Sequence, residues 1–211
     1  MSATPNQVRV RSATSTGSHA EFIVAAWDST LPYLRSIGAG EMWGDQPFSE
    51  RDGFREEIVD IIRQSEDDGS DARRLLVAEV DAEISADGTT SAVQVGAAMI
   101  RDALPDYLAK NEAIKGEMEK AKSALFIEVL IADQRAGKRH KGAGAALIDA
   151  VKHRALEQSK EVVYVDAWAG NERKLNRYYE NLGLRNGGDF TLTRGNGSTW
   201  TGTLYCIDIG S

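Results

Sequence analysis

The stretch Arg139-His140-Lys141-Gly142-Ala143-Gly144 lies between an apolar run and an amphipathic segment. The apolar run, 125–131, predicts a strand, and the apolar residues of 147–155 repeat at helical spacing. Glycines let backbone N–H groups approach an anion, and the first amides of a helix lack internal partners and carry partial positive charge. The stretch therefore predicts a loop that opens a helix and holds a pyrophosphate. A solvated basic turn is the alternative.

The bulk composition describes an ordinary globular chain. It has 211 residues, 42% of them hydrophobic, and a formal net charge of −7. This length favours one domain, residues 1–211, with a substantial core. The acidic balance argues against broad contact with nucleic acid or an anionic membrane, since both are bound through basic surface. We therefore expect neither as a partner.

The cysteine and histidine content limits the chemistry further. Cys206 is the only cysteine, so no intramolecular disulfide forms, and its apolar surroundings predict a buried, inert thiol. His19, His140 and His153 show no metal-ligand spacing, so we expect no metal. Residues 1–7 lack the apolar core of a signal peptide and no segment reaches membrane-spanning length, which leads us to expect a cytoplasmic protein.

Hydrophobic periodicity predicts, in chain order, a strand, two helices, three strands, a helix, a strand, a helix and two strands. The predicted segments are strand 8–11, helix 18–28, helix 54–62, strands 75–80, 93–100 and 125–131, helix 147–155, strand 162–168, helix 171–182, and strands 190–193 and 200–209. We find no internal repeat and no low-complexity linker.

Local signals set the predicted boundaries. Ser18 and Glu21 fit a capping box at the start of the first helix, and Pro32 is expected to interrupt it. Asn171 is a good cap for the last helix. Asp87-Gly88 suits a turn between two antiparallel strands. The charged segment 102–123 is predicted to be a helical insertion before the strand at 125.

Two motifs at their expected separation resemble the GNAT acetyltransferase superfamily, whose members transfer an acyl group from acyl-coenzyme A. Arg139-x-x-Gly142-x-Gly144 resembles the loop Q/R-x-x-G-x-G/A, which cradles the coenzyme pyrophosphate in that family. Asn171 followed by Tyr179-Glu180-Asn181-Leu182-Gly183-Leu184 resembles its second signature. The motif-bearing match covers 125–184, and the order of elements extends it over nearly the whole chain.

The resemblance implies a mixed α/β fold: a central, mostly antiparallel seven-stranded sheet, splayed between its fourth and fifth strands and flanked by helices. The segment 132–138 is longer than usual for the family and contains a small insertion. A rival register starts at Gln134 and uses Gly137, but it ends on Arg139 where the family has a small residue. We therefore prefer the register at Gly142.

The resemblance also implies acetyl-coenzyme A as the co-substrate and no metal. Strand edges left free by the splay are expected to pair with the pantetheine arm and to polarise the acyl carbonyl. The residues expected to contact the coenzyme are Val129, Leu130, Ile131, Arg139, His140, Lys141, Gly142, Ala143, Gly144, Ala145 and Asn171.

Three residues are candidates for proton transfer. An alkyl ammonium with a pKa of about 10 must lose a proton before it attacks, so a general base is needed. Asp166 is the first candidate, because strand alternation separates it from its apolar neighbours and it resembles an acidic position used by some GNAT enzymes. Glu128 is the second, as a carboxylate within an apolar strand. Tyr179 matches the family tyrosine that protonates the leaving thiolate, and Tyr178 is expected to pack in the core. A salt-bridged acid and a buried tyrosine are the structural alternatives.

The acceptor is expected to bind near the first two helices. Glu41 suits a cationic amine, and Trp43 and Trp168 offer aromatic faces for a cation–π contact. The alternative is a surface acid and core tryptophans. The sequence thus predicts an N-acetyltransferase that acts on a primary amine of a small molecule through a ternary complex. A protein or peptide N-acetyltransferase and a non-catalytic acyl-coenzyme A sensor are the alternatives, and a homodimer is a further expectation.

Overall fold

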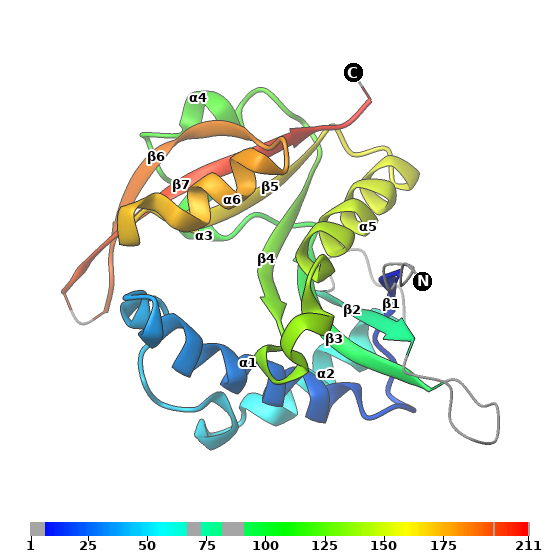
Figure 1. Cartoon of the computed structure of the whole chain (residues 1–211). Coiled ribbons are helices and arrows are strands. Elements are labelled where there is room, and N and C mark those ends of the chain that lie inside the picture. The colour runs from blue at the N-terminus through cyan, green and yellow to red at the C-terminus, as the bar shows by residue number, and fades with distance from the viewer. Residues whose placement is uncertain (1–6, 67–72, 82–90, 196, 211) are drawn as a thin grey trace, which may run out of the picture.

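The computed structural model describes residues 7–66, 73–81, 91–195 and 197–210, and a seven-stranded sheet runs through it (Figure 1). The elements are β1 (Arg9–Ser12), α1 (His19–Ser36), η1 (Gly40–Met42), η2 (Phe48–Glu50), α2 (Phe54–Glu66), β2 (Arg74–Asp81), β3 (Ala92–Arg101), α3 (Asp106–Ala109), α4 (Lys115–Met118), β4 (Ala124–Ala132), η3 (Gln134–His140), α5 (Ala143–Glu157), β5 (Val162–Trp168), η4 (Asn171–Arg173), α6 (Lys174–Asn181), β6 (Arg185–Thr193) and β7 (Thr199–Asp208). This order confirms the predicted succession of strands and main helices.

The strand order across the sheet is β1-β2-β3-β4-β5-β7-β6. Every neighbouring pair is antiparallel except β4 and β5, which are parallel. The predicted mixed, mostly antiparallel sheet of seven strands is therefore confirmed. β2 and β3 pair as expected, although Asp87-Gly88 lies outside the described residues.

The pairing of β4 with β5 is short. It runs from Ala124 opposite Val162 to Ile127 opposite Val165 and then stops. β4 continues to Ala132 along β3 only, whereas β5 continues along β7 only. The two strands therefore diverge beyond Ile127, as the predicted splay requires, and Figure 1 shows β4 between the two halves of the sheet.

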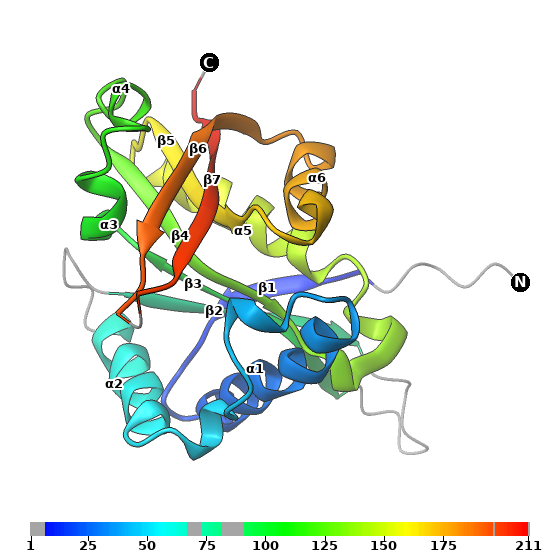
Figure 2. The same ribbon diagram turned by 90° about the vertical axis from the view of Figure 1, so that its left-hand side faces the viewer.

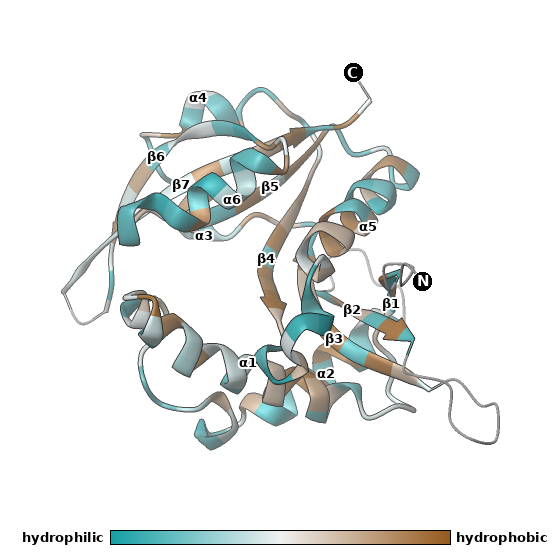
Figure 3. Ribbon diagram, in the orientation of Figure 1, coloured by the Kyte–Doolittle hydropathy of each residue, from teal (hydrophilic) through white to brown (hydrophobic). Residues whose placement is uncertain are grey.

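Strand alternation sends neighbouring residues of β4 to opposite faces of the sheet. Leu125 and Ile127 join the apolar cluster beneath α5 and α6, while Phe126 joins a cluster beneath α3 and α4. Helices α1 and α2 bury a third cluster with β2, β3 and the end of β4. Figure 2 shows α1 and α2 together, away from α3 and α4. The apolar colouring along β4 in Figure 3 agrees with its central place.

The insertion predicted at 102–123 forms two short helices, α3 and α4, rather than one long helix. Leu108 and Ile114 are fully buried and fix the insertion on β4, β5 and β7. Pro105 precedes α3 as its N-cap residue. The insertion therefore covers the face of the sheet opposite α5.

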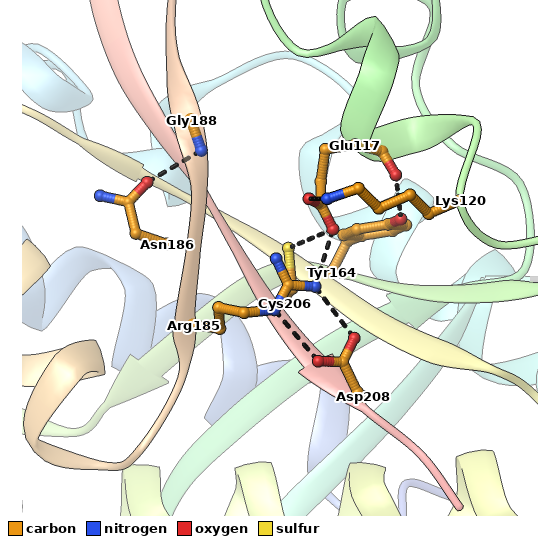
Figure 4. A network of polar contacts seen from close by, with 8 residues as sticks. All are labelled: Glu117, Lys120, Tyr164, Arg185, Asn186, Gly188, Cys206 and Asp208. Carbon is orange, nitrogen blue, oxygen red and sulfur yellow. Dashed lines mark hydrogen bonds and ion pairs between the residues drawn. The ribbon is translucent and has the colours of Figure 1, made fainter. Parts of the chain in front are cut away.

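A polar network anchors the insertion to the last strands (Figure 4). The carboxylate of Glu117 in α4 accepts hydrogen bonds from Arg185 and Lys120, both at 2.7 Å. Arg185 also donates to Asp208, and the Tyr164 hydroxyl donates to the Glu117 carbonyl at 3.2 Å. The two cations lower the pKa of Glu117 to about 2. α4 is therefore held by charge as well as by apolar packing.

Cys206 lies in the same network. Its thiol is buried, and its sulfur is 3.6 Å from a carboxylate oxygen of Glu117. Burial, with the nearby carboxylate, raises the pKa of Cys206 to about 12. A thiol that stays protonated is a poor nucleophile, so the prediction of a buried, inert cysteine is confirmed.

Two boundary predictions for the first helix are wrong. α1 continues through Pro32 to Ser36, because Pro32 lies on an exposed side of a helix whose other side packs on the sheet. Ser18 makes no side-chain cap. Instead, the backbone N–H of Thr14 donates to Nδ1 of the buried His19 at 2.8 Å, and this contact holds the turn before the helix.

The prediction that Asn171 caps the last helix is also wrong. Asn171, Glu172 and Arg173 have φ values of +50°, +52° and +59°, so the chain makes a left-handed turn before α6. α6 begins only at Lys174, and Arg173 is its N-cap residue without a side-chain cap. The side-chain oxygen of Asn171 lies instead close to Gly38, after the end of α1.

Candidate functional site

The glycine loop opens α5 as the sequence predicts. Gly142 is the N-cap residue, with φ of +90°, a conformation that residues with a side chain rarely adopt. The first amide of this helix that bonds within the helix is Ala146, whose N–H donates to the Gly142 carbonyl at 3.0 Å. Within the part of the chain that the structure describes, the amides of 142–145 have no hydrogen-bond partner. Four N–H groups are therefore free to bind an anion.

The cations near this loop are also uncommitted. Lys138, Arg139 and Lys141 are exposed, and none forms an ion pair with a described residue. The 3-10 turns of η3 fill the lengthened segment before α5 and include Gly137. Because α5 begins only after Gly142, the free amides favour the register at Gly142 over the rival one at Gly137.

Tyr178 lies against this loop and not in the core, so its expected packing role is wrong. Its side chain projects from α6, and the residue is 39% exposed. A Cβ atom added at Gly144 would lie 2.3 Å from the Tyr178 hydroxyl oxygen. Gly144 is therefore required for the close approach of α5 and α6. A groove of about 140 Å³ begins beside Ala145 and lies between α5 and the segment 182–184 that follows α6.

Two of the candidate acids lie together where the sheet splits. Ile127 and Val165 form the last β4–β5 pair, so Glu128 and Asp166 are the first residues beyond it. Both lie on the face opposite α5, because Ile127 and Val165 belong to the cluster beneath that helix. Burial raises the pKa of Asp166 to about 6, and the nearby charge of Glu128 contributes. A carboxyl group with this pKa suits a general base near neutral pH.

Glu128 lies at an irregularity of β4 and is already paired with a cation. Val129 pairs with Met99 and Ile127 pairs with Ile100, which leaves Glu128 as the extra residue of a β-bulge. Arg73 donates to Oε1 of Glu128 at 2.8 Å, while Oε2 is buried and makes no hydrogen bond to a described residue. The structural alternative of an ion-paired Glu128 is thus realised, and Asp166 becomes the stronger base candidate.

Tyr179 reaches the same region from the other face of the sheet. It is 4% exposed and packs in the cluster beneath α5 and α6, with its ring centroid 5.6 Å from that of Tyr205. Burial, together with the charge of Asp166, raises the pKa of Tyr179 above its ordinary value. Its hydroxyl therefore keeps its proton at neutral pH and can act as a donor.

The expected acceptor residues are dispersed around the end of α1. Trp43 belongs to an aromatic cluster in which its ring centroid lies 6.2 Å from that of Trp27. Glu41 is exposed, and its carbonyl accepts a hydrogen bond from Arg194 of the β6–β7 hairpin at 3.0 Å. The ring of Trp168 lies over Gly170. Packing therefore accounts for the positions of the two tryptophans, and the structure does not assign Glu41 a side-chain partner.

Three residues near the carboxylates were not expected from the sequence. Arg73 precedes β2, Arg101 ends β3, and Tyr107 lies in α3 of the insertion. The Tyr107 ring stacks on that of Phe190, with centroids 6.4 Å apart, and interacts with Asp166. No local motif marks these residues. The pairing of β2, β3 and β4 brings the two arginines to Glu128, and the insertion brings Tyr107 to Asp166.

Two further properties concern the described ranges alone. Within 7–66, 73–81, 91–195 and 197–210, no group of three or more His, Cys, Asp or Glu side chains is arranged to bind a metal ion. None of the helices in these ranges combines the length and apolar character that a membrane crossing requires.

Solved structures similar to this chain are acetyltransferases. A GNAT-family acetyltransferase from Listeria monocytogenes shares 16% identity with a TM-score of 0.59, and the alignment covers 99% of each chain. Arabidopsis thaliana NAA60 in complex with acetyl-CoA shares 17% identity with a TM-score of 0.57, covering 97% of this chain and 100% of that one. An N-acetyltransferase from Staphylococcus aureus shares 12% identity with a TM-score of 0.54, covering 96% and 98%.

These similarities show the fold. No protein-family model matches the sequence, and no curated protein matches it either. The aligned structures span nearly the whole of both chains in each case, and the mixed sheet with its parallel β4–β5 pair is the GNAT arrangement. The chain therefore has the GNAT fold.

Proposed function

We propose that residues 1–211 of this GNAT-fold chain form one N-acetyltransferase domain, which transfers the acetyl group of acetyl-coenzyme A to a primary amine of a small molecule. The observation that carries this proposal is the divergence of β4 and β5. At that point a free backbone edge, a pair of carboxylates and a buried tyrosine hydroxyl meet. Donors for an anion lie farther along the chain, at the start of α5.

The residues at the start of α5 fit the pyrophosphate of the coenzyme. The free amides of 142–145 point along the helix axis, where the helix dipole favours negative charge. Arg139 and Lys141 add exposed positive charge, and the groove between α5 and the segment 182–184 offers room beside Ala145. The edge of β4 beyond Ile127 supplies backbone groups that a pantetheine arm can pair with.

The transfer requires one proton acceptor and one proton donor. In the proposed reaction, the amine nitrogen attacks the carbonyl carbon of the thioester, the N–C bond forms and the C–S bond breaks. The nitrogen loses a proton to Asp166, directly or through water, and the sulfur gains a proton from Tyr179. Asp166 suits its role because its pKa is about 6, and Tyr179 suits its own because burial keeps it protonated.

The arrangement of the two groups supports a ternary complex. Asp166 lies on the face of the sheet that carries the insertion, whereas Tyr179 packs on the face beneath α5. The gap between β4 and β5 connects these faces. Amine and thioester can therefore approach from opposite sides of the sheet and meet in the gap, so that proximity supplies much of the rate.

A free-thiol assay tests the proposal. Purified protein is supplied with acetyl-coenzyme A and, in separate reactions, polyamines, aminoglycosides, amino acids and short peptides. We expect thiol release that depends on the amine and is strongest with one small-molecule class. Thiol release with peptides alone would show that the acceptor is a peptide and not a small molecule. Coenzyme binding without thiol release in any reaction would replace the enzyme by a non-catalytic sensor of acyl-coenzyme A.

A further inference from the structure

Arg101 is a partly buried cation without a hydrogen-bond partner. It ends β3 opposite Phe126, and its side chain is 24% exposed. The nearest acid is Glu128, whose Oε2 lies 3.9 Å from Nη1 of Arg101, beyond hydrogen-bond distance. Among the described residues, no carboxylate or carbonyl accepts a hydrogen bond from its guanidinium. A partly buried guanidinium without a hydrogen-bond acceptor is suited to bind the anionic group of a ligand.

Glu128 does not need Arg101 as its counter-ion. The Oε1 atom of Glu128 already accepts a hydrogen bond from Arg73 at 2.8 Å, and Arg73 has a second acid, Glu57, at the same distance. Arg73 thus donates hydrogen bonds to two carboxylates of this chain, whereas Arg101 has with Glu128 an ion pair of 3.9 Å and no hydrogen bond. Of the two arginines, Arg101 is therefore the one whose guanidinium is available to bind a ligand.

Charged side chains of both signs lie around the splay. Glu128 and Asp166 are carboxylates, and Arg73 and Arg101 are guanidiniums. Tyr107 of the insertion adjoins Asp166 and also interacts with Arg101, so the four charged groups share one region. A ligand with both an ammonium and a carboxylate can place the first near the acids and the second on Arg101, whereas a diamine offers Arg101 no anion.

We propose that Arg101 forms an anion subsite beside the proton-accepting carboxylate, and that the acceptor is an amine which also carries a carboxylate, as an α-amino acid does. In such a molecule one carbon separates the ammonium from the carboxylate. Asp166 then faces the amine while Arg101 donates to the carboxylate, and the protonated Tyr107 hydroxyl supplies a further donor. This inference rests on the proposed function and narrows its substrate class.

The test compares each of several L-amino acids with its carboxamide and with its decarboxylated amine in the free-thiol assay. We expect kcat/KM for the free acid to exceed that for the carboxamide by roughly 10- to 100-fold, the range of one charge-assisted hydrogen-bond pair. Arg101→Gln should lower the value for the acid to that of the carboxamide and leave the carboxamide little changed. Arg101→Lys should restore part of the preference.

The matched control is Arg63→Gln, which removes an exposed arginine of α2 whose ion pair, in the part of the chain that the structure describes, is with Asp60. It should leave the preference intact. Circular dichroism and coenzyme affinity establish that each variant is folded. Equal use of acid and carboxamide by the unaltered protein, or a preference that survives Arg101→Gln, would overturn the subsite.

A calorimetric titration separates this inference from the proposed function. Amino acids and their carboxamides are titrated into protein saturated with coenzyme A. Absence of thiol release with every amine overturns the proposed transfer. In that case, tighter binding of the acids than of the carboxamides still supports the anion subsite, and equal or absent binding of both overturns it.

Discussion

The proposed coenzyme side of this site consists mainly of backbone groups, whereas the proposed acceptor side consists of side chains. The loop at 139–145, the proposed anion site, offers free backbone amides, and the φ of +90° at position 142 favours glycine. The acceptor side consists of side chains from β3, β4, β5 and the insertion, held by ion pairs such as that of Arg73 with Glu128. Backbone sites depend on local conformation, whereas side-chain sites depend on the whole fold. Substitutions should therefore affect the two sides separately.

The largest effect is expected from Tyr179→Phe, which removes the proposed proton donor without changing the anion loop. We expect kcat to fall about 100-fold or more, within the range of general acid catalysis, while coenzyme affinity stays near its original value. Steady-state kinetics and calorimetry measure the two quantities. The control is Tyr178→Phe, since Tyr178 is the neighbouring, exposed tyrosine. Similar losses in both variants would contradict the assignment of the donor to Tyr179.

The next effect concerns the anchoring of the acceptor side. Glu117→Gln removes a carboxylate that is 8% exposed and paired with Arg185 and Lys120. We expect the free energy of unfolding to fall by about 2–3 kcal/mol, measured in urea, because Lys120 loses its carboxylate and Arg185 keeps Asp208 alone of its two. Acceptor KM should rise more than coenzyme Kd, since α4 belongs to the insertion.

The same carboxylate predicts a pH dependence of stability. Its pKa is lowered from 4.5 to about 2, so its contribution is full above 4.5 and is lost as the pH falls towards 2. Glu117→Gln should lack this part of the acid transition. Asp106→Asn is the control, because Asp106 and its partner Lys110 are both highly exposed, so that this pair should contribute little to stability. Equal acid transitions in all three proteins would argue against the anchor.

A smaller effect is expected on the coenzyme side. Gly142→Val forces a side chain into left-handed backbone and should raise coenzyme Kd roughly 10-fold or more, with a smaller change in acceptor KM. Gly53→Val is the control, because Gly53 also has a positive φ, of +75°, but precedes α2. It should lower stability and leave coenzyme affinity unchanged. An unaltered coenzyme Kd for Gly142→Val would contradict the assignment of coenzyme binding to this loop.

The smallest effect is a protonation effect on the acceptor side. The raised pKa of Asp166, about 6, leaves the carboxylate available as a base only above that pH. Below it, kcat/KM should fall about tenfold per pH unit. Asp166→Asn should have a low kcat/KM that no longer falls with pH below 6. The coenzyme Kd of the unaltered protein should stay constant over these pH values. A fall that persists in Asp166→Asn would assign the titration to another group, with Glu128 the first to examine.

The sequence predicted the local structure of the glycine loop better than the surroundings of the carboxylates, for a physical reason. Hydrophobic periodicity and the glycines act over a few residues, so the element order and the start of α5 followed from local patterns. Glu128 and Asp166 were recognisable singly, as acids within apolar strands. Their cations were not, because Arg73 lies 55 residues from Glu128 in the chain and meets it only through the sheet.

The errors at helix ends have a similar origin. A proline usually ends a helix. At Pro32 this local preference is outweighed, because the opposite side of α1 packs on the sheet. Asn171 usually caps a helix, yet the left-handed turn of three residues delays α6. Tyr178 and Tyr179 are adjacent and chemically alike, so only the orientation of α6 decides which of them is buried.

The short β4–β5 ladder has a mechanical consequence. On each side of it the strands form an antiparallel sheet. Among the described residues, β4 and β5 join the two sheets through the pairs from Ala124–Val162 to Ile127–Val165, and the N–H of Glu161 donates to the carbonyl of Ser123 just before them. This short ladder therefore connects the two halves of the sheet. A molecule inserted along its open part would replace the missing hydrogen bonds and clamp the two halves, so hydrogen exchange at β4 and β5 should slow on saturation with coenzyme while the outer strands change little.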